Sequence, residues 1–291
     1  MFEPPPVQRL HVESAESCTP HLPPELEAYI FELAARLSLS TAATLLQVAH
    51  RAAEWVYPAL YQTVVIYPSD YRPFRFTDNI RTFQQYGRYV RHLLISSAAT
   101  EGDLSNLSVN PDKIISVLSY CPYMTSLALW CGPVTTRVLQ MLQTLPLRHL
   151  SIDIGPSLLI DLPNVTFPYL THIELISASQ VMDWSVLSIF PKLTHVAVGD
   201  MEGHDHVVRG IVENCRTLTT FVIVGYGFNR EVVNADESRQ DGRDTRIVGV
   251  YCDYVFDWLR CVAGERDMWT AAEEELARRR LILNSVDTPL L

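Results

Sequence analysis

The chain has 291 residues and a formal net charge of −10, and 48% of its residues are hydrophobic. This hydrophobic content is enough for a sizeable core, which argues against a disordered chain. The acidic balance argues against a nucleic-acid binder and against a protein held on a membrane surface by basic residues, so we expect neither nucleic acid nor membrane as a partner.

Cysteine usage and the N-terminus indicate the compartment. The six cysteines occur singly and form no CxxC pair, which predicts buried thiols in a reducing environment. The stretch MFEPPPVQRL lacks the basic flank and apolar run of a signal peptide. The uncharged run 114–136 is long enough to span a bilayer, but its prolines and glycine favour a helix, a strand and a turn within a core. We therefore expect an intracellular protein, cytoplasmic or nuclear.

The first structured element begins after a Pro-, Glu- and Ser-rich segment at 1–19, which we expect to be a loose tail. In HLPPELEAYIFELAARL, Pro24 suits the first helical position, and Glu25 and Glu27 favour the positive end of the helix dipole. The apolar residues recur at i, i+3, i+4 and i+7, which predicts an amphipathic helix of about 13 residues.

Two more helices and a strand follow. The segment SLST breaks the first helix, and Ser40 is a suitable N-cap for a second helix that extends through Trp55. Pro58 would end this second helix and open a short third one. The β-branched stretch at 63–67 then predicts a strand.

An apolar-x-x-apolar-x-apolar pattern then recurs, and it predicts a series of strands. Its copies are VRHLLI at 90, MTSLAL at 124, LRHLSI at 147, LTHIEL at 170, LTHVAV at 193 and LTTFVI at 218. Four of them start at intervals of 23 residues, which is typical of leucine-rich repeats. Unrelated half-buried strands are the alternative, and equal successive intervals argue against it.

The segments between these strands predict short helices, at 110–122, 135–146, 182–191 and 205–215. An earlier repeat would use the helix at 76–87, with Gly87 as its C-cap. After a polar loop at 227–246 and a last strand, two helical segments hinged near Gly264 would close the end of the array.

The N-terminal helices, which precede the repeats, resemble the F-box, specifically the F-box-like domains of large fungal families. The resemblance covers 21–67, although the connection SLSTAA is short for this family. It rests on Leu22-Pro23, Glu25, Ile30-Phe31, Leu46, Val48, Trp55 and the exit Pro58-Ala59-Leu60-Tyr61. It implies docking of the F-box on the Skp-type adaptor of an SCF ubiquitin ligase, while the repeats hold a target protein.

Together these features predict an α/β fold: a three-helix F-box-like unit, then a right-handed leucine-rich-repeat solenoid with one parallel sheet and a C-terminal helical cap. The expected boundaries are 1–19 for the tail, 20–62 for the F-box-like domain, 63–250 for the repeats, and 251–291 for the cap and tail. By the resemblance, the adaptor would be bound by Leu22, Pro23, Leu26, Ile30, Leu45 and Leu46. The alternative for each residue is that it packs the small three-helix core.

Histidines recur at one repeat position, at 92, 149, 172 and 195. This position would face the concave surface, and because parallel strands lie about 4.8 Å apart, the histidines should stack as a ladder. We expect target contacts on the concave face from His149, Ser151, Asp153, His172, Glu174 and His195, with Asp153 and Glu174 on adjacent exposed positions. The ladder either reads a target, with a pH response because histidine titrates near neutrality, or simply suits the repeat framework.

No catalytic, phosphate-binding or dinucleotide motif occurs, and we expect no cofactor and no metal. The HDH stretch at 204–206 fits a solvated turn better than a metal site. The sequence therefore predicts a non-catalytic, substrate-recognition subunit of a ubiquitin ligase. Alternatives are a repeat scaffold that does not engage the adaptor, and an enzyme using His149 or His172 with Asp153, for which no nucleophile or cofactor motif is found.

Overall fold

The computed structural model describes residues 22–66, 76–96, 110–132, 134–153, 164–176, 184–199, 205–226 and 244–286. The expected tail at 1–19 and most of the polar loop at 227–246 lie outside these residues. The chain divides into two compact units, with the boundary between Leu60 and Tyr61.

The N-terminal unit consists of three helices, α1 (Pro24–Leu37), α2 (Leu39–Leu45) and α3 (His50–Leu60). As predicted, α1 starts at Pro24 and carries Glu25 and Glu27 in its first turn. The three helices pack on one small core, with Ala35, Ala42 and Val56 buried and with Phe31, Leu45, Leu46, Ala59 and Leu60 partly buried around them.

Two predicted boundaries in this unit are wrong. The N-cap of α2 is Ser38, whose hydroxyl accepts the Thr41 N–H at 3.1 Å, so a single residue connects α1 and α2. The predicted second helix is divided between α2 and α3, and Pro58 lies inside α3. Because Pro58 lies in the last turn, it removes one backbone donor close to where the helix ends anyway.

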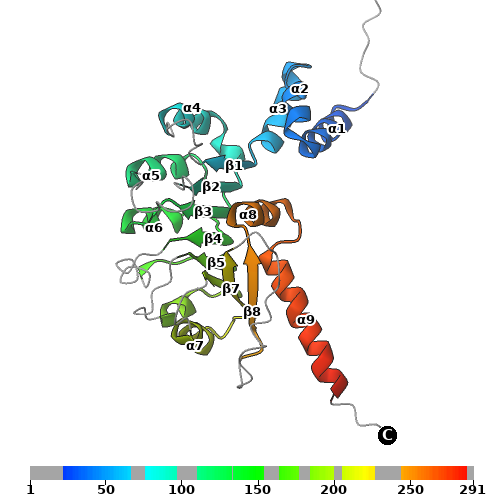
Figure 1. Ribbon diagram of the computed structural model, residues 1–291. Helices are drawn as coiled ribbons and strands as arrows, with labels where there is room; N and C mark the ends of the chain where they lie inside the picture. The colour runs from blue at the N-terminus through cyan, green and yellow to red at the C-terminus, as the bar shows by residue number, and fades with distance from the viewer. Residues whose placement is uncertain are drawn as a thin grey trace, which may run out of the picture. The chain divides into compact units, whose positions relative to one another are not determined.

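The second unit is built on one eight-stranded sheet in which every strand is parallel to its neighbour and follows chain order (Figure 1). This confirms the prediction that the recurring segments lie side by side. The strands are β1 (Thr63–Ile66), β2 (His92–Ser96), β3 (Ser126–Trp130), β4 (His149–Ile152), β5 (His172–Leu175), β6 (His195–Gly199), β7 (Thr220–Tyr226) and β8 (Ile247–Cys252).

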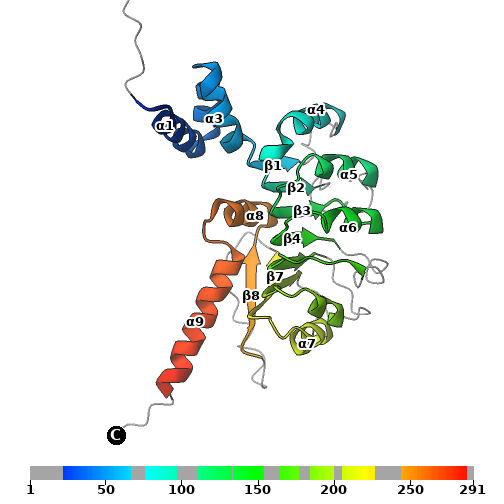
Figure 2. The same ribbon diagram turned by 180° about the vertical axis from the view of Figure 1, so that it is seen from behind.

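Helices that connect the strands lie along one face of the sheet, as Figures 1 and 2 show from opposite sides. The residues at 184–189 form a 3-10 helix instead of the expected longer helix. The connecting elements are α4 (Phe76–Tyr86), η1 (Gly87–Tyr89), α5 (Pro111–Ser119), α6 (Thr136–Leu142), η4 (Trp184–Ile189) and α7 (Asp205–Asn214).

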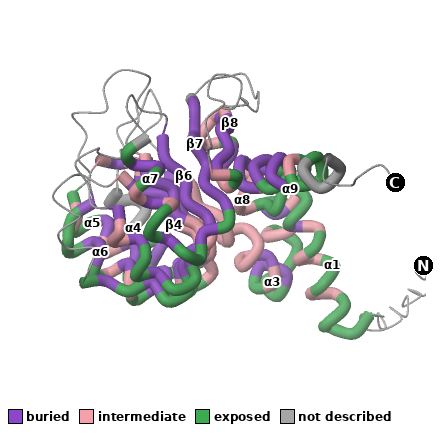
Figure 3. The backbone as a smooth tube through the Cα atoms, turned by 90° about the horizontal axis from the view of Figure 1, so that it is seen from below, coloured by how far each residue is buried: buried purple, intermediate pink, exposed green. Residues whose placement is uncertain are grey.

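The largest core cluster lies between this face and the connecting elements. Alternate residues of each strand point into it, as the period of two of a strand requires. In Figure 3, β6 and β7 accordingly run as buried segments through the middle of this unit. The strand residues of this core include Leu93, Ile95, Leu127, Leu129, Leu150, Ile152, Ile173, Leu175, Val196 and Val198.

Gly87 directly follows the last residue of α4, where the sequence predicts a C-cap, but its φ is not positive. A glycine is needed here for space, because a Cβ at this position would lie 2.4 Å from the backbone oxygen of Tyr120. Any larger residue would therefore push η1 away from the end of α5. Gly264, by contrast, has φ 71° and terminates a helix in the left-handed conformation, as the expected hinge.

The C-terminal helices α8 (Tyr254–Ala263) and α9 (Met268–Val286) lie on the opposite face of the sheet (Figures 1 and 2). In α8, Trp258 packs on Leu94 of β2 and Ala128 of β3. The start of α9 packs on β7 and β8, through Met268, Trp269, Ala272 and Leu276 against Val222, Val224, Val248 and Val250. The two helices were expected only to close the end of the array, whereas they cover much of a face.

The uncharged run at 114–136 forms α5 and β3, as predicted, and among the described helices none is both long enough and apolar enough to cross a membrane. The five described cysteines are free, and all except Cys261 are buried, which confirms the expected buried thiols. Burial raises the pKa of the Cys121 thiol to about 12.

Candidate functional site

The candidate site is the sheet face under α8 and α9, which we call the histidine face. Strand register places His149, His172 and His195 directly beside one another on β4, β5 and β6. Two positions further along the same strands, Ser151 pairs with Glu174 and Glu174 with Ala197. The site therefore consists of two adjacent rows, one of histidines and one that is mainly polar on β4 and β5.

The predicted histidine ladder is present. The ring centroids of His149 and His172 are 4.3 Å apart, and those of His172 and His195 are 4.1 Å apart with nearly parallel planes. Trp269 of α9 sets its ring edge-on to both His172 and His195, with centroids 5.1 and 5.7 Å away. The ladder is thus packed beneath a helix, so it is not the open surface that the sequence predicted.

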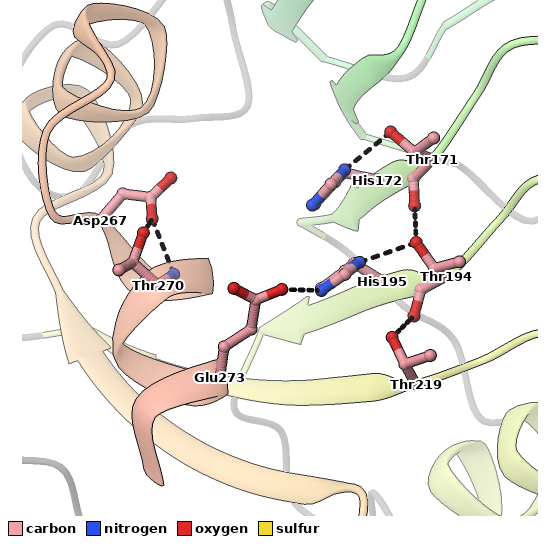
Figure 4. A network of polar contacts seen from close by, with 8 residues as sticks. All are labelled: Thr171, His172, Thr194, His195, Thr219, Asp267, Thr270 and Glu273. Carbon is pink, nitrogen blue, oxygen red and sulfur yellow. Dashed lines mark hydrogen bonds and ion pairs between the residues drawn. The ribbon is translucent and has the colours of Figure 1, made fainter. Parts of the chain in front are cut away.

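A threonine before each of two ladder histidines holds the imidazole ring (Figure 4). The hydroxyl oxygens of Thr171 and Thr194 lie 2.8 Å from Nδ1 of His172 and His195, respectively. The same hydroxyls lie within hydrogen-bond distance of the carbonyl oxygen one strand earlier, as does Thr219. These contacts run across successive strands and fix the side chains at the start of the ladder.

The hydrogen bonds of His195 define its protonation. Its Nε2 lies 2.9 Å from Oε1 of Glu273, and a carboxylate can only accept, so Nε2 carries a hydrogen. In the neutral ring Nδ1 is then an acceptor, and the Thr194 hydroxyl donates to it. That hydroxyl consequently gives up the longer contact of 3.3 Å to the Thr171 carbonyl. If His195 were protonated, its Nδ1–H would donate to the Thr194 hydroxyl, which could then donate to the Thr171 carbonyl.

The histidine face favours neutral imidazoles. Burial is the main cause that lowers the pKa of His172 to about 2, with additional repulsion from His149 and His195. Burial likewise lowers the pKa of His92 to about 4 and lowers the pKa values of His149 and His195. For His195 the carboxylate of Glu273 opposes the effect of burial. The ladder is therefore uncharged at neutral pH, which argues against the interpretation that it responds to pH near neutrality.

Beside the ladder lies a buried polar chain. Trp130 Nε1 donates to Ser151 Oγ at 2.7 Å, and Ser151 Oγ donates to Glu174 Oε2 at 2.6 Å. Burial raises the pKa of Glu174 to about 7; the bond from Ser151 opposes this shift, and the nearby Asp257 adds to it. Asp257 of α8 is also buried and accepts the Met268 N–H at 3.1 Å, at the start of α9. Two carboxyl groups are therefore buried near one another under α8.

The space between the rows and the C-terminal helices is small. A cavity of about 30 Å³ is lined by polar groups that include Ser126, Ser151 and Glu174, and by the rings of Trp258 and Trp269. This volume matches about one water molecule, and it is too small for a substrate. Within the described parts of the chain, no three histidine, cysteine or carboxylate side chains converge to hold a metal ion.

Several expected target-binding residues are not available to a partner. Ser151, Glu174 and His195 are buried, and because Glu174 exposes only 6% of its surface, the prediction of an exposed position is wrong for Glu174. The reason is the cover formed by α8 and α9. Asp153, His149 and His172 are half-buried.

The expected adaptor-binding residues fall into two groups. Leu22, Pro23, Leu26 and Ile30 are exposed at the start and along one side of α1. Leu45 and Leu46 are partly buried and pack against the small core of the N-terminal unit. Leu45 and Leu46 therefore follow the alternative prediction, in which these residues pack the small core. The side chains of Leu22, Pro23, Leu26 and Ile30 are exposed and could contact another molecule.

Sequence reasoning missed the residues that α8 and α9 bring to the site. Cys261 Sγ lies 3.4 Å from His149 Nδ1, and Trp269 and Glu273 contact the ladder as described above. A signal was present, because the bulky apolar residues Trp258, Met268 and Trp269 need a surface to pack on. The sequence does not say which surface that is.

No protein-family model matches the chain, and neither does any curated protein.

Proposed function

We propose that the chain is a non-catalytic, substrate-recognition subunit of an SCF-type ubiquitin ligase. In this proposal the N-terminal helices dock on a Skp-type adaptor, and a leucine-rich-repeat array holds the target protein. The mechanism is proximity, since the subunit needs only to bring target lysines close to a charged enzyme.

The observation that carries the proposal is the apolar surface of α1. Six large apolar side chains, spaced so that most follow one stripe of the helix, remain exposed: Leu22 45%, Leu26 50%, Tyr29 63%, Ile30 50%, Leu33 51% and Leu37 79%. The core of the same unit is small, since its described buried apolar residues are four alanines and Val56. An exposed contiguous apolar stripe next to so small a core favours a helix that is completed by a partner groove.

The sheet supports the second part of the proposal. Its eight strands follow chain order in parallel, and four of them derive from segments that repeat every 23 residues, as a leucine-rich-repeat array requires. The histidine face is occupied by α8 and α9, so the target surface in this proposal lies elsewhere on the array.

The test is capture of the full chain by a purified Skp-type adaptor, with the double variant Leu26→Glu/Ile30→Glu. Both side chains are about half exposed, so burial in the complex would contribute about 1 kcal/mol from each, and the variant should bind at least thirtyfold more weakly. The control is Phe256→Glu/Leu281→Glu, which also replaces two exposed apolar side chains with glutamate, on the C-terminal helices.

The outcomes separate the candidate functions. Capture of the wild type and of the control, with loss in the α1 variant and unchanged circular dichroism, would support adaptor docking. A folded wild-type chain that the adaptor does not capture would leave the repeat scaffold without ligase coupling as the better description. Equal capture of all three proteins would mean that the α1 stripe is not the docking surface.

A further inference from the structure

A row of alternating cations and tyrosines lies at the edge of the sheet where β2 to β6 begin. In strand order the row consists of Arg91, Tyr123, Arg148, Tyr169 and Lys192. Each precedes its strand by one to three residues, and all are exposed except Arg91, which is half-buried. We call these five residues the edge row.

The edge row is ordered by contacts between neighbouring strands. The guanidinium carbon of Arg91 lies 5.1 Å from the centroid of the Tyr123 ring, and Nζ of Lys192 lies 5.1 Å from that of Tyr169. Arg148 stands between the two pairs, because its N–H donates to the Thr125 carbonyl on one side and its carbonyl accepts the Thr171 N–H on the other. Tyr123 and Tyr169 thus position Arg91 and Lys192, while the backbone bonds fix the place of Arg148.

The charge of the edge row is opposite to that of the chain. No carboxylate among the described residues forms an ion pair with Arg91, Arg148 or Lys192. No Asp or Glu occurs in the turns that carry the row, which are 87–91, 120–125, 143–148, 165–171 and 190–194. On a chain with net charge −10 this is a local concentration of cations that have no carboxylate partner in the described part of the chain. The nearby Glu273 is directed to His195 of the adjacent row.

The dimensions of the edge row suit an extended chain. Four strand intervals separate Arg91 from Lys192, which corresponds to about 19 Å at the usual spacing of parallel strands. An extended peptide of about six residues covers this distance. The three cations are about 10 Å apart, and alternate side chains of the peptide lie on the same side about 7 Å apart, so each flexible cationic side chain has an acidic side chain within reach.

We propose that the edge row is a docking surface for an extended acidic peptide segment of a partner protein. Carboxylates would pair with the three cations, and the tyrosines would supply apolar contact between them. A nucleic acid fits less well, because three cations neutralise few phosphates and one face of each tyrosine ring is already occupied by a cation. The inference goes beyond the proposed ligase role and does not depend on adaptor binding.

The test measures binding of a labelled eight-residue peptide of alternating glutamate and serine by fluorescence anisotropy, with the full chain at low salt. The variant is Arg91→Gln/Arg148→Gln/Lys192→Gln. Because exposed ion pairs each contribute modestly, loss of all three should weaken binding by about tenfold. The matched control, Arg81→Gln/Arg209→Gln/Arg280→Gln, removes the same charge from exposed positions on α4, α7 and α9 and should bind like the wild type.

Three results would overturn the proposal: a peptide with glutamine in place of glutamate that binds as well, equal weakening in the variant and the control, or tighter binding of an eight-nucleotide thymidine strand than of the acidic peptide. Capture by the Skp-type adaptor should be the same for the wild type and the edge-row variant. Failure of the edge-row proposal can therefore be distinguished from failure of adaptor docking.

Discussion

Replacing the buried carboxyl group of Glu174 should stabilise the folded chain at neutral and alkaline pH. The pKa of Glu174 is raised from its ordinary value of 4.5 to about 7, mainly by burial. Between these two values Glu174 holds a proton in the folded chain that it has lost in the unfolded chain. The contribution of protonated Glu174 to stability is therefore fully present below pH 4.5 and is lost as the pH rises through 7. The total loss corresponds to about 3 kcal/mol.

The variant Glu174→Gln has the same shape as the protonated side chain, and its amide oxygen can still accept from Ser151. We therefore expect the free energies of unfolding of variant and wild type to be similar near pH 4.5. At pH 8 the variant should be more stable by about 3 kcal/mol. Effects of the histidines cancel, because they are common to both proteins.

Urea-induced unfolding at pH 4.5, 6 and 8, followed by circular dichroism, measures this difference. The control is Glu213→Gln, which removes an exposed carboxylate from the end of α7 and should show no gain that depends on pH. If the advantage of Glu174→Gln were the same at all three pH values, ionisation of a buried carboxyl group would not be its cause, and the reasoning would be refuted.

Two further predictions concern the ladder and its cover. Because burial lowers the pKa of His172, the unfolded chain binds a proton at this residue first as the pH falls; the contribution of His172 to stability is fully present above pH 6.5 and is lost below it. Relative to the wild type, His172→Asn should therefore gain about 2 kcal/mol in free energy of unfolding between pH 8 and pH 5, measured by urea titration. An unchanged difference between the two proteins would contradict a neutral buried ring. Trp269→Ala should cost about 3–5 kcal/mol, because the ring is 7% exposed and packs on His172 and His195, whereas Phe256→Ala, at a 62% exposed position of α8, should cost under about 0.5 kcal/mol; similar losses in both would refute the packing argument.

The sheet could be predicted because its pattern depends on local sequence. Each strand places apolar residues with a period of two, and a constant interval of 23 residues brings equal positions together on neighbouring strands. The contact between His149, His172 and His195 follows from this rule alone. The 3-10 geometry at 184–189 and the division between α2 and α3 depend on packing that the apolar pattern does not describe.

The cover of the histidine face could not be predicted, because it depends on long-range packing. An amphipathic α8 needs an apolar surface, but its sequence is equally compatible with the end of the sheet and with one of its faces. Glu174 was expected to be exposed because a charged residue on a strand usually faces water. In the structure Ser151 donates a hydrogen bond to Glu174, and α8 lies over this part of the sheet, at a position that the sequence leaves open.

The cover also has a consequence for synthesis on the ribosome. The contact between His149 and Cys261 joins residues 112 positions apart, and that between His195 and Glu273 joins residues 78 positions apart. The strands β2 to β6 therefore emerge long before the helices that shield one of their faces. Until α8 and α9 leave the exit tunnel, a nascent chain displays this half-polar surface to chaperones, and a chain truncated before residue 254 would display it permanently.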